Sequence, residues 1–171
     1  MKIIVQPEYK LTSGQITYFE SYMQITTPKH QKRYKNYYGS CFLIDENGEL
    51  QNSMQNLATR KKLVTLFNLE AKEVLDVDRL PKANKFGTNI IYFESENDQE
   101  NNLTSVYKAI GMIIPALHDF CVKYKTVCLV SSHIEEYTPD LTEIDEPHIH
   151  ILFVKTSNIR GYDKLTDFLT E

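Results

Sequence analysis

The chain has 171 residues, of which 42% are hydrophobic, and a formal net charge of −4 at pH 7. This length allows one domain with its own core, and because no run of about 18 apolar residues occurs we expect no membrane-spanning helix. The negative charge disfavours a protein that wraps nucleic acid but allows a local basic groove, and three cysteines without a Cys-x-x-Cys pair predict a reduced, cytoplasmic protein.

The N-terminal part of the chain predicts a strand followed by a helix. Residues 2–9 form a short apolar run that ends at polar residues, which is typical of a β-strand. Thr12 and Ser13 offer an N-cap, and the apolar residues after them recur at helical spacing to about Gln24. We therefore expect a helix directly after the first strand.

The middle of the chain predicts two strands separated by one long helix. Residues 40–44 form an apolar run that stops at an Asp-Glu-Asn-Gly turn cluster. The pattern over residues 51–80 is helical, and Pro81 ends it. Residues 88–93 predict the next strand, and an acidic, Asn-rich loop follows it.

The C-terminal part predicts a helix, two neighbouring strands and a closing helix. A wide apolar stripe predicts a helix over residues 103–124, in which Pro115 predicts a kink or a break. Residues 126–133 and 147–154 predict strands joined by an acidic linker, and residues 159–168 predict the last helix. The element order β-α-β-α-β-α-β-β-α predicts an α+β domain with an antiparallel pair at its end.

Two histidines lie in the last predicted strand, on one face. His148 and His150 are two residues apart, and successive strand side chains alternate between faces. An unpartnered polar group costs roughly 1–3 kcal/mol when buried, and one divalent metal ion would satisfy both imidazoles. His133 ends the preceding strand and Glu136 follows it, so a hairpin would bring them to the same end of the sheet. We predict that these four residues bind a divalent metal. Imidazoles with a carboxylate suit Mn, Zn or Ni and tolerate Mg when phosphate oxygens complete the site, and we place Mn or Mg first.

The segment around these residues resembles the HUH endonucleases, which are plasmid relaxases and rolling-circle replication initiators. The resemblance covers His133-Ile134-Glu135-Glu136 and Pro147-His148-Ile149-His150, with Glu136 in place of the more frequent Asp and a longer linker between the motifs. It implies a central antiparallel sheet, ferredoxin-like or palm-like, that is flanked by helices and binds a divalent metal. It also implies a tyrosine that cleaves one DNA strand and leaves a 5′-phosphotyrosine link. The nuclease domain would span residues 1–171, alone or as the N-terminal part of a longer protein.

The resemblance does not select the tyrosine nucleophile by itself, because the chain has 11 tyrosines. Relaxases carry their tyrosine near the N-terminus, which favours Tyr18 and then Tyr22, four residues apart on one face of the first helix. Replication initiators carry it after the histidine strand, where Tyr162 lies, although the tyrosine could also follow Glu171. Ordinary helix packing is the competing explanation for Tyr18 and Tyr22.

A basic, aromatic stretch follows the first helix and could hold a single DNA strand. Lysines and arginines neutralise phosphates, and aromatic rings stack on bases. The predicted contacts are Lys29, Lys32, Arg33, Tyr34 and Lys35. The predicted partner is single-stranded DNA at an origin or nick site, with accessory proteins of a mobile element and no membrane.

Four alternatives compete with a relaxase-like nickase. The first is a replication initiator, and the second is a DNA-binding domain of the same fold that forms no covalent adduct. The third is a metal-dependent phosphoesterase that uses water in place of tyrosine. The fourth is an interaction protein whose buried histidines are hydrogen-bonded and bind no metal.

Overall fold

The computed structural model describes most of the chain. The described residues are 1–9, 11, 16–34, 40–54, 57–94, 101–134, 136–143 and 145–170. Of residues 18, 52–54, 57 and 58 only the backbone is described. Lys35, one of the predicted DNA contacts, lies outside the described residues.

The fold is built on one six-stranded sheet in which every neighbouring pair of strands is antiparallel. In spatial order the strands are β1 (Lys2–Val5), β4 (Phe86–Glu94), β6 (His148–Val154), β5 (Cys128–His133), β2 (Cys41–Ile44) and β3 (Leu50–Met54). The predicted α+β class with a central antiparallel sheet flanked by helices is confirmed, as is the antiparallel pair formed by β5 and β6.

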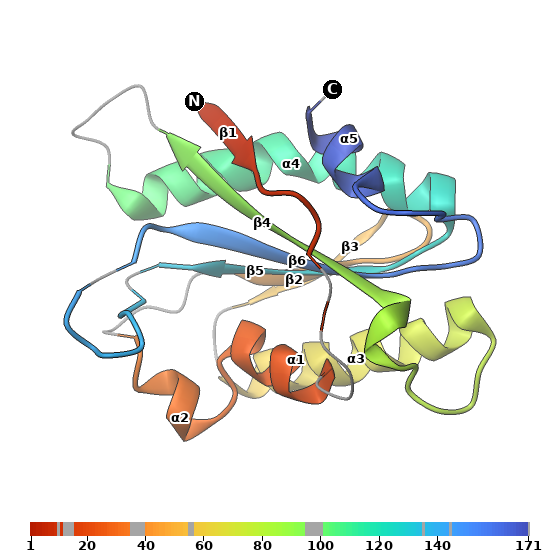
Figure 1. Cartoon of the computed structure of the whole chain (residues 1–171), viewed down its shortest axis with the longest axis horizontal. Coiled ribbons are helices and arrows are strands. Elements are labelled where there is room, and N and C mark those ends of the chain that lie inside the picture. The colour runs from red at the N-terminus through yellow and green to blue at the C-terminus, as the bar shows by residue number, and fades with distance from the viewer. Residues whose placement is uncertain are drawn as a thin grey trace.

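Helices cover both faces of this sheet (Figure 1). On one face lie α1 (Ile16–Gln24), α2 (Pro28–Gln31) and α3 (Leu57–Leu75), and on the other lie α4 (Asn102–Tyr124) and α5 (Lys164–Thr170). A 3-10 turn, η1 (Ala83–Lys85), leads into β4. Each layer has its own apolar core, because alternate strand residues point to opposite faces.

Strand β6 lies in the middle of the sheet and is buried along its whole length. Such a strand reads as a continuous apolar run because both of its faces pack against helices. It pairs with β4 on one side and β5 on the other. The histidines at its start therefore enter a dry interior, where their ring nitrogens need partners.

One strand was missed by the sequence pattern. The helix predicted over residues 51–80 is wrong at its start, where β3 pairs with β2 in a hairpin. Asp45 forms the turn: its Oδ1 accepts from the backbone N–H groups of Asn47 and Glu49, at 2.9 and 3.0 Å, and Gly48 has a φ of +79°. The turn fixes the hairpin, and the polar residues of β3 carry no apolar alternation that could have predicted it.

Two helix predictions also need correction. Pro115 neither ends nor splits α4, which is continuous from Asn102 to Tyr124. Proline removes the hydrogen bond to the carbonyl of Gly111, and both residues lie on the exposed side of the helix, where water can replace the lost donor. The closing helix begins at Lys164, because Gly161 and Asp163 have positive φ angles of 80° and 64°.

The helix α4 is long and apolar enough to cross a membrane by length and composition alone. Its apolar face, however, packs against the sheet through residues such as Val106, Ile113 and Phe120. This packing accounts for the hydropathy of α4, as in the core helix of a soluble domain.

Glu20 makes the stability of this fold depend on pH. It lies on α1 and is 1% exposed, and burial raises the pKa of its carboxyl from 4.5 to about 7, an effect that the neighbouring Asn68 partly offsets. The contribution of Glu20 to the free energy of unfolding is therefore fully present below about pH 4.5. It is lost as the pH rises through 7, and the loss is on the order of 3 kcal/mol. We expect Glu20→Gln to raise the melting temperature by roughly 5–10 °C at pH 8 and to change it little at pH 5.

The measurement is thermal unfolding followed by circular dichroism at the two pH values. Glu73→Gln, an exposed glutamate of α3, is the matched control and should melt like the parent at both. An equal effect of Glu20→Gln at pH 5 and pH 8 would contradict this account.

Candidate metal centre

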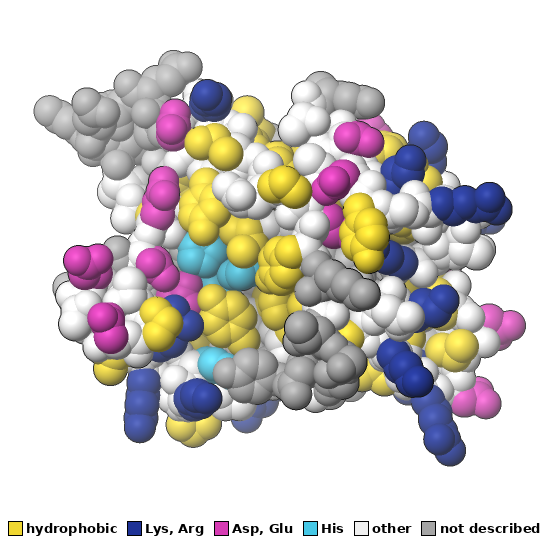
Figure 2. Space-filling model, viewed as in Figure 1, with side chains coloured by type: hydrophobic (Ala, Val, Ile, Leu, Met, Phe, Trp, Pro, Cys, Tyr) yellow, Lys and Arg dark blue, Asp and Glu magenta, His cyan; other side chains and the backbone are white. Residues whose placement is uncertain are grey.

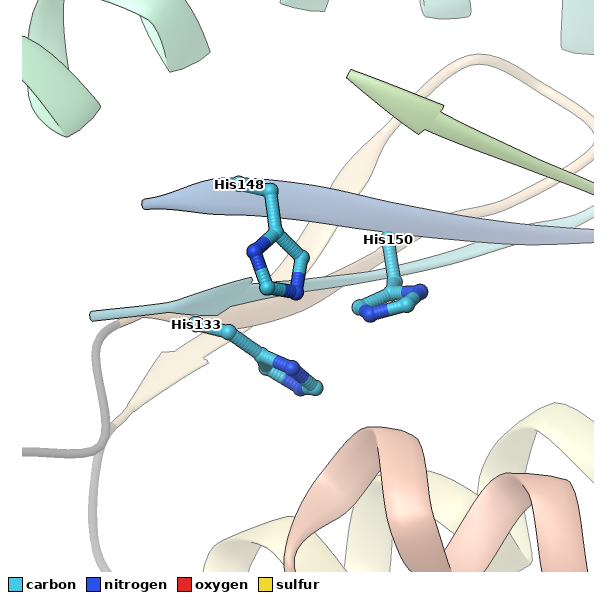
Figure 3. A group of neighbouring side chains, drawn as sticks. All are labelled: His133, His148 and His150. Atoms are coloured by element: carbon cyan, nitrogen blue, oxygen red, sulfur yellow. The ribbon is translucent and has the colours of Figure 1, made fainter. Parts of the chain in front are cut away.

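Three histidines converge at one end of the sheet, on the face covered by α1 (Figure 3). The pairing of β5 with β6 sets His133 opposite His148, and Ser131 opposite His150. The ring centroids of His133 and His150 are 4.4 Å apart, and those of His148 and His150 are 4.9 Å apart. All three side chains are buried, with one nitrogen of each within 4.8 Å of the others, so the group could hold a metal ion.

Backbone carbonyls orient two of the three rings. His148 Nδ1 lies 2.7 Å from the carbonyl oxygen of Glu146, and His133 Nε2 lies 2.9 Å from that of Met23. A carbonyl oxygen only accepts, so these nitrogens carry the protons. In the neutral rings the lone pairs are then on His148 Nε2 and His133 Nδ1. This is the usual orientation of metal-ligating histidines, whose other nitrogen donates to a fixed acceptor.

Both lone pairs face the carboxylate of Glu136. Glu136 Oε2 is 3.4 Å from His133 Nδ1 and 3.2 Å from His148 Nε2. Acceptor then faces acceptor, an arrangement that requires a proton or a cation between the atoms. Among the described residues, Glu136 Oε2, His133 Nδ1 and both nitrogens of His150 have no hydrogen-bond partner. A divalent cation would satisfy these buried atoms together, so the donor set fits the predicted metal.

Burial and the contacts with Glu136 set the protonation states of this cluster. Burial lowers the pKa of His133, against its contacts with Glu136. Burial lowers the pKa of His150 far more, and the neighbouring His133 and His148 lower it further. Burial alone would raise the pKa of Glu136, but its contacts with His133 and His148 outweigh burial and hold the pKa far below its usual range. Glu136 is therefore an anion beside imidazoles of which two are poor bases.

Tyr22 lies against this cluster from α1. Its hydroxyl donates to Glu136 Oε1 at 3.0 Å, and its ring packs edge-on against His133 and His150, with centroids 5.5 Å from each. Burial and the charge of Glu136 raise the pKa of its hydroxyl. Tyr22 is thus in direct contact with the predicted ligands.

The end of α1 helps to place both Tyr22 and His133. Ile25 ends the helix with a φ of +56°, which is costly for a β-branched residue, at about 1–2 kcal/mol. The Ile25 N–H bonds to the carbonyl of Tyr22, and the Thr26 N–H bonds to that of Ser21. The carbonyl of Met23 stays free to accept from His133. A strained residue therefore sits directly beside the site.

The segment after α2 closes the site on its other side. Arg33 Nη2 lies 3.3 Å from Glu136 Oε1, and Arg33 Nε donates to the carbonyl of Tyr137 at 3.0 Å. Tyr34 is 7% exposed, packs edge-on against His133, and forms a backbone bridge with Glu136. Arg33 and Tyr34, which were predicted to contact DNA, thus take part in the centre itself.

The other predicted residues are more distant or less completely described. Lys29 and Lys32 are exposed at α2. The backbone of Tyr18 lies in α1, but its side chain is not described. Tyr162 lies beside Lys155, whose Nζ is 3.9 Å from its ring centre, at the opposite end of β6 from His148.

His30 is a neighbour of the centre that the sequence analysis missed. It is buried, its ring centroid lies 5.6 Å from that of Tyr22, and its Nδ1 is 2.8 Å from Thr27 Oγ1. The sequence Thr27-Pro28 is a typical N-cap followed by proline and could have predicted the short helix that carries His30.

Comparisons with known protein families, with curated proteins and with solved structures return no significant match.

The centre should bind one Mn²⁺ per chain, measured by titration calorimetry and by metal analysis after gel filtration. We expect His150→Ala to lower the affinity at least 100-fold, because it removes a buried ligand. At a hundred times the dissociation constant, Mn²⁺ should stabilise the parent by about 2.7 kcal/mol and raise its melting temperature by roughly 5–10 °C.

His118→Ala is the matched control, since His118 is exposed on α4 and contacts the carbonyl of Gly48. It should leave the affinity for Mn²⁺ unchanged. Equal binding by the parent and His150→Ala would show that the metal lies elsewhere.

Proposed function

We propose that the chain is a metal-dependent enzyme that nicks and rejoins single-stranded DNA at a specific site, as the relaxases among the HUH endonucleases do. The observation that carries the proposal is the position of Tyr22, a hydroxyl nucleophile bonded to the same carboxylate that contacts His133 and His148. A tyrosine beside a buried metal-binding group would combine the nucleophile and the charge stabilisation that a reversible DNA nick uses.

The donor set supports a divalent cation held by His133, His148 and His150, with Glu136 as the fourth ligand. We propose Mn or Mg as the physiological ion, with Zn or Ni as alternatives. When bound, the cation would offset the negative charge of the scissile phosphate and polarise it. Three neutral imidazoles suit this task because they leave most of the charge of the cation uncompensated.

The proposed reaction is a transesterification by Tyr22. Its Oη forms a bond to the phosphorus while the bond from phosphorus to the 3′ oxygen breaks, and the phenol proton ends on that oxygen. The products are a 5′-phosphotyrosine and a free 3′ hydroxyl. The energy of the phosphodiester bond is kept in the new link, so a 3′ hydroxyl can reverse the reaction and join the strand.

The bond of Tyr22 to Glu136 favours it over Tyr162 as the nucleophile. Tyr18 lies four residues before Tyr22 on the same helix and stays a candidate for the nucleophile. Tyr162 is the candidate if the tyrosine follows the histidine strand, as in replication initiators. Its ring lies beside Lys155, just past the end of β6 that is opposite His148, and β6 is about 20 Å long at about 3.3 Å per residue.

The DNA would approach past α2, where Lys29 and Lys32 are exposed and could neutralise phosphates. Arg33 would act by holding Glu136 in place, since it already contacts that carboxylate. We further propose a cytoplasmic enzyme of plasmid or mobile-element transfer that acts at an origin or nick site with accessory proteins.

A second candidate is hydrolysis of a phosphodiester by water, with Tyr22 as a structural residue. The raised pKa of its hydroxyl and its bond to Glu136 favour this alternative. It needs the metal but no tyrosine, and so the two candidates predict different products.

The deciding experiment incubates the protein with pooled single-stranded oligonucleotides and Mn²⁺ and resolves a covalent protein–DNA band on a denaturing gel. We expect a band that Tyr22→Phe reduces at least 1000-fold, because the phenyl ring keeps the packing but has no nucleophile. Tyr162→Phe is the matched control and should leave the band unchanged.

Peptide mapping of the adduct identifies the residue that attacks. An adduct on Tyr18 would support the proposed nicking activity but would place its nucleophile one helical turn earlier on α1. Cleaved DNA without an adduct would favour hydrolysis by water, and the absence of both cleavage and adduct would refute the proposal.

A further inference from the structure

Beside the histidines, the same face of the sheet continues across β4 onto β1. The register sets Tyr92 opposite His148, and Ile90 opposite His150. On the other side of β4, Ile4 lies opposite Tyr92. These side chains share one face, and over them lies a cavity of about 660 Å³ with a floor formed by Ile4 and Ile90.

Two tyrosines line this cavity. The ring of Tyr92 is half-buried and lies 5.6 Å from that of His148, so the cavity borders directly on the metal centre. Tyr9 is 37% exposed; its ring packs edge-on against Phe19, and its backbone bridges to Thr88. Both rings are held by neighbours and keep part of their surface open. Figure 2 shows histidine side chains among hydrophobic ones on the side of the molecule that is seen in Figure 1.

The charges around the cavity are negative. Glu94 and Glu146 line it and are exposed, whereas no described lysine or arginine does so. Carboxylates repel a phosphate but accept hydrogen bonds from amino groups. Aromatic rings stack on nucleobases at this kind of surface. The lining therefore suits a nucleobase that carries an exocyclic amino group.

A second, larger cavity lacks these features. It has a volume of about 1080 Å³ and lies at the other end of β6, beside Lys155 and Ile159. Its described lining contains Arg79, Lys82 and Lys85 but no aromatic ring, so it offers no stacking surface.

We propose that the cavity formed by Tyr9, Tyr92, Glu94 and Glu146, which we call the tyrosine slot, holds one unpaired amino-bearing base next to the scissile phosphate. Cytosine, adenine and guanine carry such an amino group, and thymine does not. The slot rests on the proposed function, since it assumes that the strand to be nicked passes the histidines. The slot would make nicking depend on the DNA sequence. Tyr92 and Tyr9 would stack on the base, and the carboxylates would accept hydrogen bonds from an amino group that thymine lacks.

The test measures binding of fluorescein-labelled dC12 and dT12 by anisotropy, in Mn²⁺ and in a Tyr22→Phe background so that no strand is cut. Cytosine and thymine are both pyrimidines and stack similarly, so their comparison keeps the size of the ring constant while a carbonyl replaces the amino group, with changes at N3 and C5 as well. We expect at least a fivefold preference for dC12. Tyr92→Ala should weaken binding of both strands roughly tenfold, because it removes one stacking surface.

The double variant Glu94→Gln, Glu146→Gln should lose the preference for dC12 while it binds dT12 as well as before or better. Both glutamates are exposed, so this change should not disturb the fold. Tyr162→Ala, which removes an exposed ring at the far end of β6, is the matched control and should change neither affinity nor preference.

The outcomes separate this proposal from the function on which it rests. Unchanged preference in the glutamate variant, or unchanged affinity in Tyr92→Ala, overturns the slot even if the parent forms the adduct on Tyr22. A parent that forms no adduct and binds neither strand overturns both.

Discussion

The buried carboxylate of Glu136 is the contact on which the candidate centre depends. It lies in the segment between β5 and β6, yet it contacts Tyr22 of α1 and Arg33 after α2, as well as His133 and His148. One oxygen serves the tyrosine and the arginine, and the other faces the two imidazoles. Four parts of the chain are thus fixed to one anion, and the helix layer is attached to the strands at the histidine end.

This arrangement lowers the stability of the folded protein and holds the side chains of the site in position before any ligand binds. A buried polar atom without a partner costs roughly 1–3 kcal/mol, and His150 alone contributes two such nitrogens among the described residues. The left-handed Ile25 beside the site adds strain. Unpartnered polar atoms and a strained residue thus occur together at the histidine end of the sheet, a combination that is typical of a functional site. A bound cation would give most of these polar atoms a partner.

The sequence predicted those parts of the centre that depend on short spacing. The His-x-His pattern of β6, the hairpin that brings His133 to it, and Glu136 three residues later all follow from strand alternation and antiparallel pairing. The roles of Arg33 and Tyr34 did not follow, because they contact residues about 100 positions away, and such contacts are set by the packing of the whole helix layer.

The same limit applies to the fold. Apolar runs located β2, β4, β5 and β6, whereas the polar strand β3 is held by a turn at Asp45 and by its pairing with β2. The spatial order of the strands was also beyond the sequence pattern. Periodicity shows that β6 is buried on both faces, but it does not show which strands are its neighbours.

The central place of β6 has a consequence for how the protein folds. Among the described residues, β1 with β4 and β5 with β2 and β3 form two separate ribbons, and β6 alone joins them. Since β6 follows the other five strands in the sequence, each ribbon has an open edge, at β4 and at β5, until β6 inserts. Pairing of β6 with β5 brings His148 and His150 to His133, and pairing of β6 with β4 joins the two ribbons and closes the second edge. The strand that completes the sheet is thus also the strand that completes the histidine group.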